Sequence, residues 1–273
     1  MKLGLINSAW AQVGKGTRFG VEQTKRIGFD TIDVLADPLD IDQTERNLIR
    51  TSAAELGLPI KSVCCVAVGL IDLFPSVRRF HVERVKRHLD MCRDFGCDNL
   101  LLVLGEYIWE QQIAPPAEQW KYGVQNTRDV GEYAKSLGLE IAIELEPFKL
   151  SLVNSVDTML RFLDDVALPN VMANCDISHL HLVRAPVGDV ARLKGRIAHV
   201  HLSDCDGKVH GDLPPGRGVT PVKDYLRAIR DTGFDRTVSI ELEFAPQPDR
   251  IVEWVEEAYR ETDRIMRELN CRG

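Results

Sequence analysis

Several features that would place this chain of 273 residues in another class of protein are missing from it. It has no apolar run of about 18 residues, which a membrane-spanning helix would require. Its start, MKLGLINSAWAQ, lacks the apolar stretch and small-residue cleavage site of a signal peptide. The seven cysteines are an odd number without a CxxC pair, so they imply no disulfide framework. We therefore expect a cytoplasmic protein without a membrane partner.

Positive charge is also scarce. The chain carries 34 Lys and Arg against 41 Asp and Glu, a net charge of −7, and its basic residues form no stripe. A protein that binds nucleic acid needs a cationic surface to displace the counterions of the phosphates. We therefore expect no nucleic-acid partner and a small molecule as the substrate.

The sequence contains no linker rich in Ser, Gly or Pro, so we expect residues 1–273 to form one domain. Short apolar runs rich in β-branched residues alternate with longer segments in which apolar residues recur every three or four positions. This alternation and the chain length are typical of a single-domain (β/α)8 TIM barrel, an α/β fold. The predicted strands begin at Lys2, Thr31, Ile60, Asn99, Ile141, Val171, Arg196 and Thr237, and the predicted outer helices cover 19–27, 43–56, 77–95, 118–137, 156–166, 187–193, 222–232 and 251–269.

Glycine follows several of these helical segments at the point where a left-handed residue closes the last turn. These glycines are Gly28, Gly57, Gly96, Gly138 and Gly233. In each case the next predicted strand begins within a few residues, which supports the order of helix, glycine and strand.

Acidic or imidazole side chains stand at the ends of four successive predicted strands. They are Glu144 in IAIELE, Asp176 in VMANCD, His201 in RIAHVHLSD and Glu241 in TVSIELE, at separations of 32, 25 and 40 residues. Each separation is close to one strand-helix repeat, so in a barrel all four side chains converge at one end. Three carboxylates and one imidazole suit a hard or borderline divalent ion. The sequence predicts a site for one divalent metal ion, with Mn²⁺ as the first choice and Mg²⁺ or Co²⁺ as alternatives.

Three further residues lie two positions from one of these ligands: Glu146, His199 and Glu243. Because side chains alternate along a strand, each faces the same way as the ligand beside it. Spacing alone does not decide between the members of a pair. We interpret Glu146 and Glu243 as carboxylates at the rim or behind the ligands, and His199 as an interior histidine hydrogen-bonded to a neighbour.

These motifs resemble those of the xylose isomerase-like barrels, in particular the sugar phosphate isomerase/epimerase group. That group includes ketose 3-epimerases, hydroxypyruvate isomerases and inosose dehydratases, and the resemblance covers essentially the whole chain. It implies that the metal is held by the Glu of IELEP, the Asp of NCDISH, the His of HVHLSD and the last-strand Glu of SIELEF, which are the four predicted ligands. It also implies that His179, in the D-x-x-H pattern, contacts substrate.

The chain departs from the ketose 3-epimerases at two positions. They carry a Glu six residues after the first ligand and an Arg six residues after the histidine ligand, where this chain has Leu150 and Gly207. The segment SDCDGKVHGDLPPGRG after the seventh strand offers other polar side chains, among them Asp204, His210 and Asp212. Ketose 3-epimerisation itself is therefore less secure than the metal-assisted chemistry.

A divalent ion that chelates a hydroxy-carbonyl compound makes the C–H between the two oxygens more acidic, because the enediolate charge falls on oxygen. We expect Glu144 and Glu241 to transfer the proton, and His179, His210 and Glu146 to contact the substrate. This predicts an isomerase or epimerase of a small carbohydrate or hydroxy-keto compound. The alternative is a lyase or dehydratase of a ketosugar, an inosose or a 3-keto (C-)glycoside, with His179 or His210 as the acid.

Other classes fit less well. Nucleases that share the fold use three zinc ions and more histidines than the seven here, and the acidic charge opposes DNA. A non-catalytic binding or structural barrel should not gain turnover with Mn²⁺, so a metal titration would exclude that alternative. Assembly into a homo-oligomer is compatible with the sequence and is left open.

Overall fold

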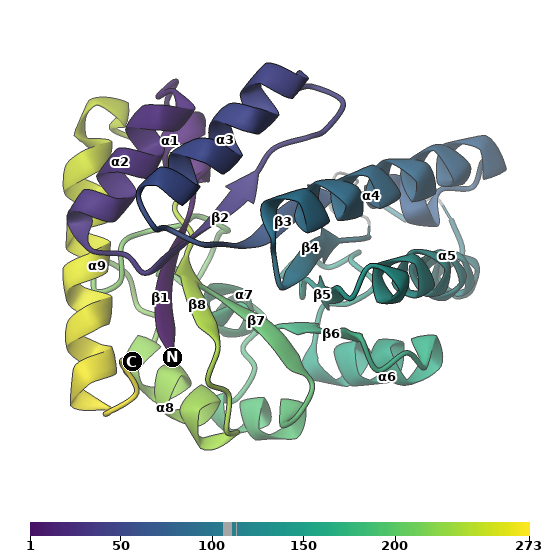
Figure 1. The fold of residues 1–273 in the computed structure, drawn as a ribbon. Helices are drawn as coiled ribbons and strands as arrows, with labels where there is room; N and C mark the ends of the chain where they lie inside the picture. The colour runs from purple at the N-terminus through teal and green to yellow at the C-terminus, as the bar shows by residue number, and fades with distance from the viewer. Residues whose placement is uncertain (106–110, 113) are drawn as a thin grey trace.

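The computed structural model describes residues 1–105, 111–112 and 114–273 (Figure 1). Eight parallel strands pair in sequence order and β8 pairs with β1, which closes the sheet. The predicted TIM barrel is therefore confirmed. The strands are β1 Lys2–Ile6, β2 Thr31–Leu35, β3 Ile60–Val66, β4 Asn99–Val103, β5 Glu140–Ile143, β6 Val171–Asn174, β7 Ile197–Leu202 and β8 Thr237–Ile240.

The helices surround the barrel and cover its outer face (Figure 1). None of those in the described part of the chain is long and apolar enough to cross a membrane. The α-helices are α1 Ser8–Ala11, α2 Thr17–Ile27, α3 Gln43–Glu55, α4 Pro75–Phe95, α5 Pro116–Ser136, α6 Val156–Val166, α7 Ile177–Leu182, α8 Val222–Asp231 and α9 Ile251–Glu268, and the 3-10 helices are η1 Val68–Ile71, η2 Val187–Leu193 and η3 Pro248–Arg250.

The outer layer between β6 and β7 differs from the prediction. The segment Val187–Leu193 forms a 3-10 helix, and the α-helix α7 precedes it. The sequence pattern did not reveal α7, because six residues are too few to show a helical period. Asp176 caps this helix, since its side chain accepts a hydrogen bond from the backbone N–H of His179.

The helix ends agree with the glycine signals. Gly28 and Gly96 take the left-handed conformation directly after α2 and α4, with φ of 116° and 72°. Gly57, Gly138 and Gly233 also have positive φ. Only glycine adopts such angles without steric cost, so these residues let the chain turn back towards the next strand.

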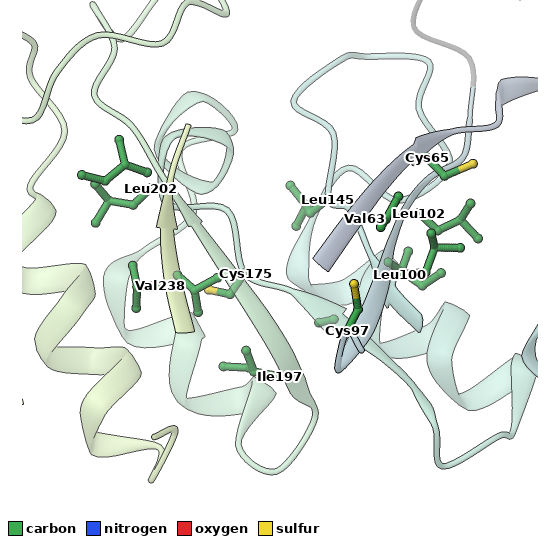
Figure 2. Close-up of a cluster of buried hydrophobic side chains, with 14 of the residues drawn as sticks. Val63, Cys65, Cys97, Leu100, Leu102, Leu145, Cys175, Ile197, Leu202 and Val238 are labelled. Atoms are coloured by element: carbon green, nitrogen blue, oxygen red, sulfur yellow. The ribbon is translucent and has the colours of Figure 1, made fainter. Parts of the chain in front are cut away.

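Strand alternation divides the buried side chains into two groups. Residues such as Val63, Cys65 and Leu102 point out of the barrel and join the main hydrophobic core beneath the helices (Figure 2). Several inward-facing residues form polar contacts, and Ser62 Oγ donates a 2.8 Å hydrogen bond to Asn99 Oδ1 on the neighbouring strand. The fold is thus held by the outer core, and the interior can carry polar groups.

Candidate functional site

The four predicted ligands lie together at the C-terminal ends of their strands. Glu144 directly follows β5, Asp176 follows β6, His201 is in β7 and Glu241 directly follows β8. Glu144, Asp176 and His201 are buried, while the Glu241 side chain is 17% exposed. In TIM barrels, active sites lie at the C-terminal end of the strands.

The ligand atoms are close enough to share one ion. One ligand atom each from Glu144, Asp176 and His201 lie within 4.8 Å of one another. Glu241 adds a third carboxylate and the fourth predicted ligand, because its Oε2 is 3.3 Å from His201 Nδ1. The folded barrel therefore brings together all four residues that the sequence analysis named as ligands.

Four atoms of this cluster have no hydrogen-bond partner among the described residues. They are Glu144 Oε1, Asp176 Oδ2 and both ring nitrogens of His201. Buried polar atoms nearly always find a partner, and leaving one unpaired costs about 1–3 kcal/mol. Two carboxylate oxygens and an imidazole that converge without partners fit a divalent cation, which all of them could coordinate.

The pKa values of the clustered carboxyl groups also support a cation at this position. Burial raises the pKa of Glu144 to about 8, and the charge of Asp176 adds to this effect, although His179 opposes it. Burial and the charges of Asp212 and Glu243 raise the pKa of Glu241 well above its ordinary value. A cation would relieve this repulsion and hold the carboxylates ionised.

His201 is suited to be a neutral ligand. Burial, together with the charge of His199, lowers its pKa to about 3. The ring is therefore uncharged at neutral pH, as metal coordination through a ring nitrogen requires.

Asn174 and Ser178, which the sequence analysis did not single out, donate hydrogen bonds to two of the predicted ligands. Asn174 Nδ2 donates a 2.7 Å hydrogen bond to Glu144 Oε2. Asp176 Oδ1 accepts from Ser178 Oγ at 2.9 Å and from the backbone N–H of His179 at 2.7 Å. Each carboxylate thus keeps one oxygen in the protein and leaves the other unpaired. The signal for Asn174 was its position two residues before Asp176 on the same face of β6.

His199 is an interior histidine hydrogen-bonded to a neighbour, as interpreted. Its Nε2 lies 2.8 Å from Asp33 Oδ2, and Asp33 also accepts from the backbone N–H of Ser62. Burial works against an ionised Asp33, but the charge and the hydrogen bond of His199 outweigh it and lower its pKa. Ligand atoms of Asp33, His199 and His201 also lie within 4.8 Å of one another. The sequence analysis did not single out Asp33, although it lies in the predicted strand TIDVLA, where it can face the barrel interior.

His179 and His210 contact each other at the edge of the site. His179 Nδ1 lies 2.7 Å from the Leu145 carbonyl oxygen, so it carries a hydrogen, and the two Nε2 atoms are 2.8 Å apart. Burial disfavours a charged His179, but Asp176, Glu144 and Glu146 outweigh it and raise its pKa well above 6.5. Burial and the charge of His179 lower the pKa of His210 to about 4. These two pKa shifts favour His179 as the donor and His210 as the acceptor in this contact.

Glu146 and Glu243 lie at the pocket beyond the ligands. Glu146 is 7% exposed, and burial raises its pKa. Glu243 Oε1 accepts a 2.8 Å hydrogen bond from Gln12 Nε2 of the turn after α1. Both carboxylates line the same cavity as Glu144 and Glu241.

The segment after β7 contains two buried carboxylates, Asp204 and Asp212. Asp204 is buried and accepts hydrogen bonds from the backbone N–H groups of Gly216, Gly218 and Thr220, so it fixes the shape of the segment. Asp212 is also buried; its Oδ1 accepts from Ser203 Oγ, and burial raises its pKa to about 7.

A cavity of about 370 Å³ opens above the cluster. Its polar lining comes from Gln12, Glu144, Glu146, His179, His210, Glu241 and Glu243. Leu150 lines a separate pocket beside Trp120, and Gly207 lies in a turn with a φ of 74°. The two positions that differ from the ketose 3-epimerases therefore add no polar group to this cavity.

Two curated proteins to which the chain is similar are 3-epimerases. D-psicose 3-epimerase of Agrobacterium fabrum is 25% identical over 255 residues, which span 88% of this chain and 84% of that protein. Fructoselysine 3-epimerase of Escherichia coli O157:H7 is 25% identical over 168 residues, or 61% of this chain. The chain spans about three fifths of the length of that second relative, 60%.

The fold is also found in solved structures. The crystal structure of IOLI protein with a bound zinc atom superposes with a TM-score of 0.83 at 19% identity, covering 98% of this chain and 99% of that chain. The sequence matches the family described as xylose isomerase-like TIM barrel over residues 21–268. This match covers nearly the whole barrel and contains all four clustered ligands, so the chain belongs to the xylose isomerase-like TIM barrel family.

Proposed function

We propose that this protein is a divalent-metal-dependent isomerase or epimerase of a sugar or a small hydroxy-keto compound. It removes a proton next to a carbonyl and passes through an enediolate. One observation carries the proposal: unpartnered atoms of Glu144, Asp176 and His201 converge beside Glu241 beneath a pocket of about 370 Å³.

Glu144, Asp176, His201 and Glu241 would hold the ion, with Mn²⁺ as the first choice and Mg²⁺ or Co²⁺ as alternatives. A divalent ion bound there supplies Lewis acidity, which makes the C–H between two chelating oxygens easier to deprotonate. Burial of Glu144 and Asp176 keeps bulk water from competing for the site.

Glu144 and Glu241 would transfer the proton. Both line the pocket, and they follow β5 and β8, so they approach the substrate from different sides. A general base works best when its pKa is near the working pH. Burial raises the pKa of Glu144 and of Glu241 in the metal-free protein, and a bound cation would lower both pKa values again and keep the carboxylates ready to accept a proton. One carboxylate can take the proton while the other returns it to the opposite face or to the neighbouring carbon.

His179, His210 and Glu146 would bind the substrate. His179 is fixed by its contacts with the Leu145 carbonyl and with His210, and both histidines line the pocket. A substrate oxygen that takes the place of one ring in the His179–His210 contact would receive the ring N–H of the other, which can stabilise the negative charge that develops on that oxygen. Glu146 can accept a hydrogen bond from a substrate hydroxyl.

The relatives support an isomerase or epimerase over a lyase. Both curated relatives above are 3-epimerases, and an inosose isomerase of Bacillus subtilis is also similar, at 24% identity over 61% of this chain. The chain has Leu150 and Gly207 at the two positions where the resemblance to the ketose 3-epimerases implies polar residues, so we expect other side chains to contact the substrate here.

Solvent deuterium uptake tests the proposal. The protein is stripped with a chelator, reloaded with Mn²⁺, Mg²⁺ or Co²⁺, and incubated in D₂O with ketoses, inososes and 3-keto glycosides. We expect metal-dependent deuterium incorporation next to the carbonyl by NMR, and its loss in Glu241→Gln. Equal incorporation by the stripped protein would overturn the metal role, and the absence of incorporation with every compound by the loaded protein would overturn the chemistry.

A further inference from the structure

A second layer of carboxylates lies beyond the predicted metal ligands. Glu146 and Glu243 follow Glu144 and Glu241 by two residues, and all four side chains line the pocket of about 370 Å³. We name Glu146 and Glu243 the outer carboxylate pair. They follow β5 and β8, so they reach the pocket from different sides of the barrel mouth. Neither belongs to the metal cluster.

Glu146 is buried without a partner for its side chain. It is 7% exposed and lines the pocket, and its carboxylate has no hydrogen bond or ion pair with any residue in the described ranges. His179 lies nearby, but its ring nitrogens are engaged, Nδ1 with the Leu145 carbonyl and Nε2 with His210. Because a buried carboxylate is costly unless it is paired, an unpaired one that faces a pocket is available to a ligand.

Glu243 is held in place from the turn after α1. Its Oε1 accepts a 2.8 Å hydrogen bond from Gln12 Nε2, and Gln12 Oε1 accepts from the backbone N–H of Phe244 at 2.9 Å. One glutamine thus fixes both the side chain of Glu243 and the backbone that follows it. The position of Glu243 at the pocket is therefore formed before any ligand binds.

The negative charges of the outer carboxylate pair act on each other. Burial raises the pKa of Glu146, and the charges of Asp176 and Glu243 add to this effect, although His179 opposes it. Glu144, Asp176 and Glu241 already carry three negative charges around one divalent ion. The ion would therefore leave the charge of the outer pair without an equal counter-charge.

The protein supplies no Lys or Arg to this pocket from its described lining. Residues 106–110 and 113 lie outside the described ranges, but their sequence contains no Lys, Arg or His. They cannot bring positive charge to the pocket, whatever their position. The counter-charge of the outer carboxylate pair is therefore left to a ligand.

An ammonium group suits this pair better than a second metal ion or a sugar hydroxyl. A metal ion needs several converging ligand atoms, and the groups of three described residues with ligand atoms within 4.8 Å of one another include neither Glu146 nor Glu243. A hydroxyl can donate one hydrogen bond but has no charge to offset the repulsion. An ammonium group has three N–H donors and a positive charge, so it can bind both carboxylates.

We propose that the outer carboxylate pair binds an ammonium group of the substrate, which is therefore an amino derivative of a sugar or of a small hydroxy-keto compound. The carbonyl lies at the metal cluster, and the ammonium group lies between Glu146 and Glu243. This inference rests on the proposed function for the position of the carbonyl.

Calorimetric titration of matched probes tests it. 1-Amino-1-deoxy-D-fructose and 6-amino-6-deoxy-D-fructose carry an ammonium group at either end of the skeleton of D-fructose, which is the neutral reference. We expect the Mn²⁺-loaded protein at pH 7 to bind at least one amino probe tenfold or more tightly than D-fructose. In Glu146→Gln and in Glu243→Gln, which keep the side-chain shape but remove the charge, this ratio should fall at least threefold.

The control is Glu132→Gln, the same change on the exposed face of α5, which should keep the ratio. The two pocket variants are measured separately, so if one of them melts early the other decides. A fall in either, without a fall in Glu132→Gln, supports the inference. Equal affinities of all three probes, or a ratio that every folded pocket variant leaves unchanged, would overturn it. A second bound Mn²⁺ that is lost in Glu243→Gln would also overturn it, because the pair would then hold a metal ion.

The two proposals fail differently. An amino preference that the variants reduce, without metal-dependent deuterium uptake by any probe, overturns the isomerase or epimerase chemistry and supports the ammonium site. Metal-dependent uptake with equal affinities for the three probes supports the chemistry and overturns the ammonium site.

Discussion

Asn174 Nδ2 donates a 2.7 Å hydrogen bond to Glu144 Oε2, so that one oxygen of this carboxylate is fixed and the other is left unpaired. The bond joins β6 to the end of β5. It selects one orientation for a ligand whose side chain would otherwise have several. The consequences of this orientation can be measured.

Replacing Asn174 by Ala should weaken Mn²⁺ binding by about 10–100-fold, as loss of an outer partner typically does at metal sites. Calorimetric titration measures the affinity, and thermal melting measures stability. Asn170→Ala is the control, because Asn170 donates to the Gly131 and Leu139 carbonyls and not to a ligand. Unchanged affinity in Asn174→Ala would show that the hydrogen bond has no role in the site.

The ligands themselves should dominate binding. Glu144→Gln, Asp176→Asn, His201→Ala and Glu241→Gln should each lower metal affinity strongly, because each removes a charged or basic ligand atom from the cluster. Metal content after dialysis and calorimetry measure the effect. Glu132→Gln, on the exposed face of α5, should bind as the parent does. Full activity in a chelator-treated, metal-free preparation would be incompatible with the metal proposal.

Metal affinity should rise with pH between about 6 and 8. The pKa of Glu144 is raised to about 8, so below that pH the metal must displace a proton. One displaced proton changes the affinity by about tenfold per pH unit. Titrations at three pH values test this, and Glu144→Gln should reduce the slope without removing it, because the pKa of Glu241 is also raised. A flat profile in the parent protein would contradict it.

The raised pKa of Glu144 also determines how the stability of the metal-free protein changes with pH. Its folded state holds a proton on Glu144 between pH 4.5, the ordinary pKa, and about 8, whereas the unfolded state does not. The stabilisation from this proton is lost as pH rises through that window. Melting temperature with chelator should therefore fall relative to the Mn²⁺-loaded protein from pH 5 to pH 8.

His179→Gln distinguishes an isomerase from a lyase. In an isomerase His179 only positions the substrate, so deuterium uptake and turnover should fall together. In a lyase it or His210 donates a proton to the leaving group, a contribution of about 10²–10⁴-fold to turnover. Uptake that continues in His179→Gln or His210→Gln while turnover stalls would favour elimination. His181→Gln, on the same helix but outside the pocket lining, is the control.

Backbone strain after α6 offers a stability test. Ala167 is exposed and has a left-handed φ of 56°, so Ala167→Gly should stabilise the protein by roughly 0.5–1 kcal/mol. Gly138 has a φ of 73°, and a Cβ there would meet no described atom within 4 Å. Gly138→Ala should therefore destabilise by about 1 kcal/mol through backbone strain alone. Urea unfolding measures both, and effects of the same sign would refute the argument.

The sequence by itself determined the barrel and which residues gather at its C-terminal end. Strand patterns at regular intervals predict parallel strands, and residues at the ends of successive parallel strands must meet at one end of the barrel. Glu144, Asp176, His201 and Glu241 could be named for this reason.

Only the tertiary structure decided which residues support the site and what it can hold. The contacts of Asp33 with His199 and of His210 with His179 join residues 166 and 31 positions apart, and no local pattern encodes such pairs. The apolar side chains that line the pocket likewise come from four separate strands, each of which contributes only one or two of them. They are Ile6, Leu35, Cys64, Val66, Leu101 and Val103. Alternation fixes the direction of a side chain within its strand, but barrel closure and strand register decide what it meets.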